Sequence, residues 1–410
     1  MKRFFFIGCI GVIAWLATTP ARGDDGAVPT RPVFGQLVSA KVKAIFTRLQ
    51  ADHDYGRAAK EANELFDVVA IHAPDTDAYA FVDAAYAVRL SHHFEFMPAE
   101  QCDDLLPYLR RFDELAKTLA FLVSDSDKPV GVYGVLKRLI DACGDKPGVW
   151  PTLTAALCVV HDSPMERKIN ENTAVADDPV KLFDFYSANE SRMLFGIRVV
   201  PAELLIYVVD STAKIDEMKW ALAAYRGDTA VGKHFFDVPY DHEHLRTHRP
   251  KRISSAGFTL MNIRQFGGIC ADQAYFASTI GKAIGVPTAY VSGQSGEVSH
   301  AWVGFLQRKG TRDAGWNFDI GRYEAYQGIR GVISDPQTRE PYPTAISPCR
   351  PSCSARKPPT VASRSRWWMR RCVWARCRNI ANPTWRRCWA STGRLICRSR
   401  AAKRLKGDWN

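Results

Sequence analysis

Apolar residues recur at helical spacing through most of the chain between about residues 30 and 230, and Asp-, Pro- and Gly-rich connectors separate the stripes. The clearest stripes are Val38, Val42, Ile45 and Leu49; Leu105, Leu109, Phe112, Leu115, Leu119 and Leu122; and Ile215, Met218, Leu222 and Tyr225. Pro107 suits a first helical turn, and Gly227 suits a C-cap. The pattern predicts an α-helical domain over residues 24–250, without a repeat of fixed period.

The pattern changes after Ile253. One helix is predicted from Cys270 to Ile284, where Gly285 and Pro287 end it. Three β-like runs follow at 288–293, 300–307 and 316–320, separated by polar turns that contain glycine. A helix followed by an antiparallel meander predicts an α+β fold for residues 251–346, after the large helical domain.

The first 23 residues have the organisation of a secretory signal peptide. Lys2 and Arg3 precede an apolar run from Phe4 to Leu16, and Ala21-Arg22-Gly23 places small residues where a signal peptidase cleaves. An uncleaved membrane anchor is the alternative interpretation. No later stretch is long and apolar enough to cross a membrane, so we expect an exported protein without stable membrane insertion after cleavage.

The net charge of +12 comes from the end of the chain. From Ser347 onward there are 14 arginines and three lysines against one acidic residue, Asp408, whereas the preceding residues contain more acids than bases. The charge of the body therefore gives no support for a nucleic-acid partner. Residues 347–410 are also crowded with Trp and Cys and lack any helical or strand period. We expect this tail to be disordered or to come from a shifted reading frame.

The cysteines are also divided unevenly between the tail and the rest of the chain. Of the 11, the predicted signal peptide contains one and the tail contains six, which leaves Cys102, Cys143, Cys158 and Cys270 in the body. Export would permit a disulfide among the first three, with the pairing open. Cys270 would then be an unpaired thiol.

Cys270 follows the segment Gln265-Phe266-Gly267-Gly268-Ile269. The two glycines allow a sharp turn that places Cys270 in the first turn of the predicted helix. There the helix dipole and the free amides would lower the thiol pKa from about 8.5. The same amides could donate to an oxyanion, and Gln265 is a further candidate donor.

A thiolate needs a base, and the base needs an acceptor that orients it. His300 begins one predicted strand and Asp319 ends the next, so a hairpin could bring imidazole and carboxylate together. Asp313 is an alternative acceptor, but it lies in the predicted turn. Each residue alone would be unremarkable in a structural role. Together they form a candidate catalytic triad of Cys270, His300 and Asp319.

These segments resemble the transglutaminase-like superfamily between about Ile253 and Tyr323. Four motifs occur in the family's order: Gly267-Gly268-Ile269-Cys270, the run from Gly285 to Gly293, His300-Ala301-Trp302, and Trp316-Asn317-Phe318-Asp319. Many members have an aromatic residue after the cysteine, where this chain has Ala271. The resemblance implies a papain-like arrangement with Cys270 as nucleophile, His300 as its base and Asp319 as the orienting residue.

The resemblance implies acyl transfer at amide bonds of a protein or peptide substrate, by a peptidase or amidase or by a transamidase. The alternative is a catalytically inactive member that acts as a helical interaction or peptide-binding module. A nucleic-acid binder would rest on the tail alone. His242, His244 and His248 lie in a polar segment that we interpret as a solvated linker. We therefore expect neither a metal nor another cofactor.

Overall fold

The computed structural model describes residues 33–72, 78–309 and 313–344. The predicted signal peptide and the predicted tail lie outside these residues. Most of the described chain is helical. The helices are α2 (Val33–Asp52), α3 (Tyr55–His72), α4 (Ala78–Glu95), α5 (Ala99–Arg111), α6 (Asp113–Leu122), α7 (Pro129–Cys143), α8 (Pro151–Val160), α9 (Pro179–Ala188), α10 (Ala202–Val209), α11 (Ile215–Tyr225), α12 (His242–Thr247), α13 (Leu260–Phe266) and α14 (Cys270–Ala283). Within this part of the chain, no helix is both long and apolar enough to span a bilayer.

Two antiparallel sheets accompany the helices. A hairpin joins β1 (Glu166–Ile169) to β2 (Asn172–Val175). The larger sheet has the order β5-β4-β3-β6-β7. Its strands are β3 (Thr288–Ser295), β4 (Val298–Lys309), β5 (Asp313–Asn317), β6 (Gly331–Ser334) and β7 (Pro341–Pro343). The structure therefore confirms the mixed, α+β character predicted from the sequence.

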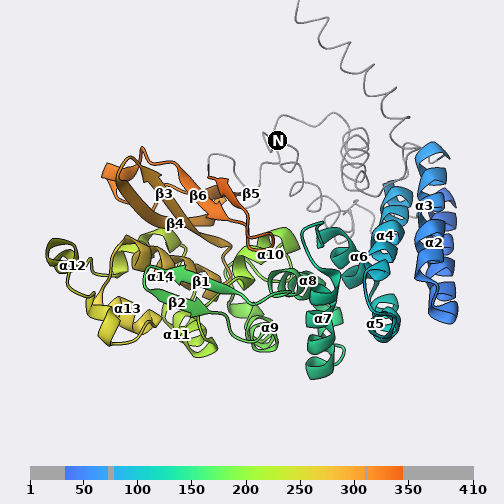
Figure 1. The fold of residues 1–410 in the computed structure, drawn as a ribbon, viewed down its shortest axis with the longest axis horizontal. Helices are drawn as coiled ribbons and strands as arrows, with labels where there is room; N and C mark the ends of the chain where they lie inside the picture. The colour runs from blue at the N-terminus through green and yellow to red at the C-terminus, as the bar shows by residue number, and fades with distance from the viewer. Residues whose placement is uncertain (1–32, 73–77, 310–312, 345–410) are drawn as a thin grey trace, which may run out of the picture.

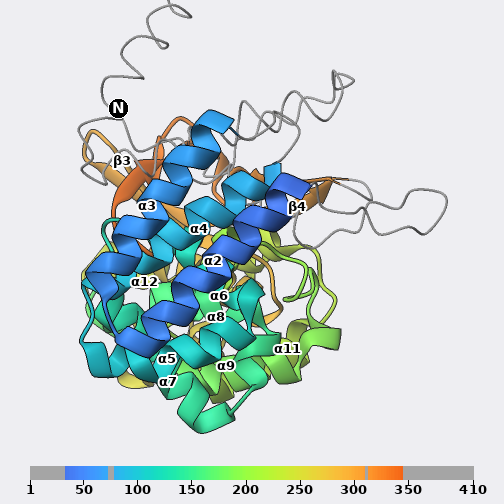
Figure 2. The same ribbon diagram turned by 90° about the vertical axis from the view of Figure 1, so that its right-hand side faces the viewer.

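Helix α14 lies at the centre of the half of the molecule that contains the larger sheet (Figure 1). It packs against β3 and β4 on one side and against α10 and α11 on the other. The 3-10 helix η3 (Val231–Asp237) also packs against α14 and β4. The helices α2 to α8 extend to the opposite end, where α2, α3 and α4 form the outer layer (Figure 2). Buried apolar side chains form one continuous cluster from Val38 to Ile333, so packing crosses the boundary predicted near residue 250.

The helical stripes are buried as predicted, with one correction. Pro107 lies inside α5, and the chain breaks at Phe112 before α6 begins, so the long stripe belongs to two helices. The proline is exposed, where solvent can satisfy the carbonyl that loses its helical donor. The predicted stop at Gly227 is confirmed, because α11 ends at Tyr225 and Gly227 has φ +80°.

Several elements were not predicted from the sequence: the β1–β2 hairpin, the strands β6 and β7, and the helix α12. The β1–β2 hairpin is short and turns through Asn170, which has φ +51°. Its strands contain Glu166, Arg167 and Lys168, so they lack an apolar alternation. The segment interpreted as a polar linker contains the short helix α12, which Asp241 caps by accepting from the amide of His244. A two-turn helix without buried residues gives no periodic signal.

A buried ion pair joins α14 to the neighbouring helix α10. The Nζ of Lys282 donates to Asp210, to the carbonyl of Tyr207 at 2.8 Å and to the carbonyl of Thr288 at 2.7 Å. Asp210 also accepts from Arg167 of β1 at 3.0 Å. Burial lowers the pKa of Lys282 to about 8, and the negative charge of Asp210 opposes the shift. The pair therefore stabilises the fold only while both partners are present.

We expect Asp210→Asn to destabilise the protein by about 3–5 kcal/mol, because the substitution leaves the ammonium of Lys282 buried without a carboxylate. Urea unfolding at pH 7 measures the change. The matched control is Asp216→Asn, which removes the exposed partner of Lys219 and should leave the unfolding midpoint unchanged. Equal effects of the two substitutions would contradict this account.

Candidate active site

Gly267 and Gly268 form the turn that precedes α14. Gly267 has φ +79°, and a Cβ there would lie 2.3 Å from the carbonyl oxygen of Pro239. A Cβ on Gly268 would lie 2.5 Å from the side chain of Asp272. The amide of Gly268 donates to Pro239 at 3.0 Å, and its carbonyl accepts from Asp241 at 2.8 Å. Gly267 is therefore required by the close approach of the segment that contains Pro239, and Gly268 by the side chain of Asp272 in α14 itself.

The start of α14 is fixed by a buried charge network that sequence reasoning missed. Asp272 accepts from the amide of Ile269 at 2.8 Å. The Nζ of Lys251 donates to both carboxylate oxygens of Asp272, at 2.8 and 2.9 Å, and also pairs with Glu171 of the β1–β2 turn at 3.2 Å. Burial raises the pKa of Asp272, and Lys251 opposes that shift. An acid at the third helical position is the signal that could have revealed this cap.

Cys270 occupies the first helical position of α14, as predicted, and is half-buried. Its sulfur faces the backbone amides of Ala301 on β4 and of Ala271. Burial raises the pKa of the thiol, while these amides oppose the shift and the charge of Asp272 adds to it. The predicted lowering of the thiol pKa is therefore wrong for this structure, because burial outweighs the helix start.

His300 lies on β4 opposite Gly293 of β3. Its side chain is only 4% exposed and is enclosed by aromatic rings, with Trp302 stacked at 5.7 Å and Tyr326 at 4.4 Å between ring centroids. Its Nε2 has no hydrogen-bond partner among the described residues. Burial lowers the pKa of His300 to about 4, and the positive charge of Arg322 adds to the shift. The imidazole is consequently neutral at physiological pH.

Asp319 was predicted to lie at the end of a strand, but β5 ends at Asn317 and Asp319 lies in the segment that follows. Its side chain is 84% exposed, and its partner is Arg322 at 3.5 Å. In the described part of the chain, no hydrogen bond joins Asp319 to His300. The backbone next to Asp319 nevertheless lies near His300. The carbonyl of Phe318 accepts from the Nε1 of Trp302 at 2.8 Å, and the ring of Trp302 stacks on His300. The structure brings Cys270 close to the strand that carries His300 and leaves the carboxylate of Asp319 outside.

Of the two other candidate groups, Asp313 lies far along β4 from His300, and Gln265 is exposed on α13. Asp313 begins β5 opposite Lys309, nine residues along β4 from His300, a separation of about 30 Å for an extended strand. Gln265 is exposed on α13 and makes no hydrogen bond within the described ranges. The donors that face the sulfur are backbone amides instead.

Aromatic residues that the sequence did not single out surround the site. Tyr240 lies beside the thiol and the amide of Cys270; burial first, and then the negative charge of the thiolate, raises its pKa to about 12. Phe236 of η3 is 52% exposed and contacts Tyr323 edge to face, with ring centroids 5.7 Å apart. These residues come from η3 and from the segments before α12 and after β5. Because these residues are far apart in the sequence, they form no motif by which the sequence could predict them.

The remaining cysteines and histidines do not form a second catalytic or metal site in the described residues. Cys102, Cys143 and Cys158 are free thiols there, and burial raises the pKa of Cys102 to about 11. His244 contacts the carbonyl of Arg249. No group of His, Cys, Asp and Glu suited to a metal ion occurs in the parts of the chain that the structure describes.

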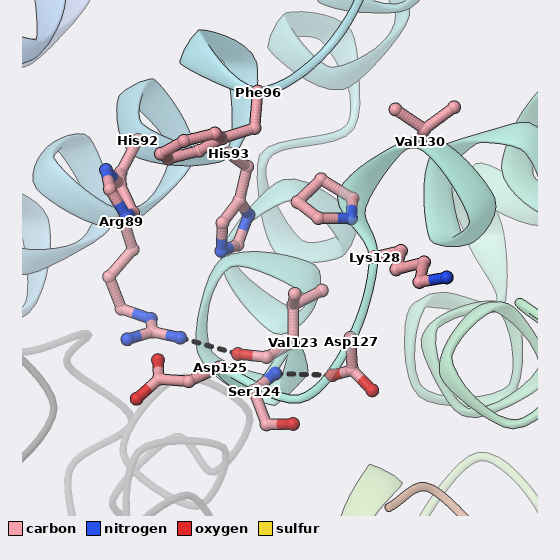
Figure 3. Close-up of a pocket in the computed structure, with 11 residues that line it drawn as sticks. Arg89, His92, His93, Phe96, Val123, Ser124, Asp125, Asp127, Lys128 and Val130 are labelled. Atoms are coloured by element: carbon pink, nitrogen blue, oxygen red, sulfur yellow. Dashed lines mark hydrogen bonds between the residues drawn. The ribbon is translucent and has the colours of Figure 1, made fainter.

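A separate pocket of about 590 Å³ lies in the helical part, between α4 and the connection from α6 to α7 (Figure 3). The guanidinium of Arg89 donates there to the carbonyls of Ala120 and Val123, and Asp127 accepts from the amide of Ser124. Burial raises the pKa of Asp127 to about 6. The pocket lies at the opposite end of the molecule from α14 (Figure 1), so it does not contribute to the Cys270 site.

Comparisons with family models, with curated proteins and with solved structures give no match to this chain.

The raised pKa of the Cys270 thiol predicts how the rate of its alkylation depends on pH. We expect the rate of iodoacetamide alkylation of Cys270 to keep rising as the pH increases beyond 9, because the thiolate is the reactive form. Mass spectrometry of tryptic peptides measures the rate at each pH. Half-buried Cys143 is the internal reference, and Cys270→Ser removes the signal. A rate that is constant above pH 7 would show that the thiol is already ionised there.

Proposed function

We propose that the protein is a cysteine-dependent enzyme that transfers an acyl group from an amide bond. The supporting observation is the sulfur of Cys270, which faces the Ala301 amide one residue from His300. Nucleophilic cysteine catalysis requires a base close to the thiol, and His300, on the strand beside the start of α14, is the proposed base. On the same basis, residues 251–346 are proposed to form a transglutaminase-like core.

In the proposed reaction, the sulfur of Cys270 attacks the carbonyl carbon of the amide while its proton passes to the neutral imidazole of His300. The developing oxyanion accepts hydrogen bonds from the amides that now face the sulfur. His300 then returns the proton to the departing amine, and a thioester remains on Cys270. Water or a second amine attacks the thioester, and the thiol is restored.

Asp319 is proposed as the residue that orients His300 and stabilises its protonated form. This role requires the carboxylate to leave Arg322 and turn toward β4. The hydrogen bond between Trp302 and the carbonyl of Phe318 keeps the backbone next to Asp319 close to that strand. Water is proposed as the usual acyl acceptor. Export is proposed from the pattern of residues 1–23, and a protein or peptide is the proposed substrate.

The second candidate is a catalytically inactive protein that uses this fold to bind peptides. The observations that favour it are the exposed carboxylate of Asp319, the raised pKa of the thiol and the enclosed imidazole. The two candidates differ in one measurable respect, because only an enzyme forms a covalent acyl intermediate.

Incubation with a library of glutamine-bearing peptides, followed by acid quenching and intact-mass analysis, tests the proposal. We expect a thioester on Cys270 that is absent in Cys270→Ala and unchanged in Cys143→Ala. His300→Ala should slow its formation by about 10²- to 10⁴-fold, which is the usual contribution of a general base. Peptide binding without any adduct at Cys270 would instead favour the inactive module.

A fluorescent primary amine added to the same reaction tests the acceptor. With water as the acceptor, the peptide products carry a new carboxylate and little of the amine. Extensive incorporation of the amine, blocked by Cys270→Ala, would identify a transamidase and contradict the hydrolytic assignment.

A further inference from the structure

Tyr323 is the centre of the aromatic cluster over the site. It lies in the segment between β5 and β6 that also carries Asp319 and Arg322. Its ring centroid lies within 5.7 to 6.2 Å of those of Phe235, Phe236, Tyr240, His300 and Tyr326. Tyr323 therefore links the covering segment to η3 and to the residues before α12, while Tyr326 of the same segment lies nearer to His300.

A single hydrogen bond ties this ring to the helix that carries the nucleophile. The hydroxyl of Tyr323 donates to the Oε1 of Gln273 at 3.2 Å. Gln273 is buried one turn after Cys270, and its Nε2 donates to the carbonyl of Val238 at 2.9 Å. Because the Val238 carbonyl can only accept, the amide orientation of Gln273 is fixed and its oxygen must face Tyr323.

The arrangement in which residues 318–327 cover His300 is interpreted as the resting state because of the groups that face the imidazole. The segment after β5 contributes the guanidinium of Arg322 and the phenols of Tyr323 and Tyr326. The 3-10 helix η3 contributes the apolar ring of Phe235, and Gly293 lies opposite on β3. The thiol of Cys270 lies near the next residue of β4. The covering segment carries two carboxylates: that of Asp319 points to Arg322 and solvent, and Glu324 is exposed.

We propose that Tyr323 is a positioning residue that acts through His300: its bond to Gln273 holds residues 318–327 closed over the imidazole, and release of that bond lets Asp319 reach His300. The proposal rests on the proposed function of Cys270 and His300. One neutral hydrogen bond contributes about 1 kcal/mol, which corresponds to an about five-fold change in the population of the open form. A reaction that proceeds through the minor open form would change in rate by the same factor.

The test compares Tyr323→Phe with Tyr326→Phe in the full chain. Each substitution removes one hydroxyl and keeps the ring, but the hydroxyl of Tyr326 makes no hydrogen bond among the described residues. Two quantities are measured: the rate of iodoacetamide alkylation of Cys270 at pH 7.5, and the titration of His300 by NMR of protein labelled with ¹⁵N-histidine. We expect Tyr323→Phe to raise the alkylation rate about five-fold and to move the His300 titration upward from about 4. Tyr326→Phe should change neither.

A second variant approaches the same bond from the other side. Gln273→Met keeps the tyrosine hydroxyl and removes its acceptor, so it should reproduce the effect of Tyr323→Phe. Thermal unfolding of all the variants shows whether each remains folded. Equal changes in Tyr323→Phe and Tyr326→Phe, or no change in either quantity, would overturn the proposal.

Neither measurement requires turnover, so the two proposals fail differently. If the bond controls His300 but no acyl adduct forms on Cys270 even in Tyr323→Phe, the positioning role stands as a property of the fold and the enzymatic function is refuted. If an adduct forms at the same rate in the parent and in Tyr323→Phe, and the His300 titration does not move, the enzymatic function stands and the positioning role is refuted.

Discussion

The site depends on the point at which α14 begins, and the buried contact between Lys251 and Asp272 determines that point. The carboxylate of Asp272 holds the amide of Ile269 and both of its oxygens accept from Lys251, so the turn before Cys270 has little freedom to shift. Gly267 then allows the segment that contains Pro239 to pass close to the turn, and Gly268 leaves room for Asp272. The two glycines are thus necessary for this geometry but not sufficient. A buried ammonium from a preceding segment completes the geometry, and its removal would leave a carboxylate buried without compensation.

Elements with a strong period were predictable, because apolar spacing reports which face of a helix or strand is buried. The stripe that begins at Val38 and the helix that begins at Cys270 are in this class. The hairpin at Asn170 and the short helix α12 were not, since neither buries an apolar face of its own. The strand containing His300 was found but begins two residues earlier, at Val298, because its pairing with β3 continues through Ser299 opposite Gln294 and Val298 opposite Ser295, where polar residues interrupt the apolar pattern.

The candidate residues were found by motif, but their chemistry was not. Cys270 and His300 occupy the predicted elements, whereas the direction of the thiol pKa shift was wrong. A helix start alone favours a thiolate; the surrounding aromatic residues exclude solvent and favour the neutral thiol more strongly. Those residues come from separate segments, so no spacing within one stretch of the sequence predicts them. The exposed carboxylate of Asp319 has the same origin, because the guanidinium that competes for it, Arg322, stacks over Trp302 at 5.0 Å.

Two buried charges elsewhere in the described chain, Lys282 and Asp272, are compensated, and the contrast with the site is informative. Lys282 has three acceptors, and Asp272 has donors from both a side chain and the backbone. Around His300 the pattern reverses, because its Nε2 and the Nε of the adjoining Arg322 have no partner among the described residues. An unsatisfied buried donor or acceptor costs about 1–3 kcal/mol. The unpaired Nε2 of His300 is thus a group that the resting protein leaves available, and it is the acceptor that the proposed reaction assigns to the proton of Cys270.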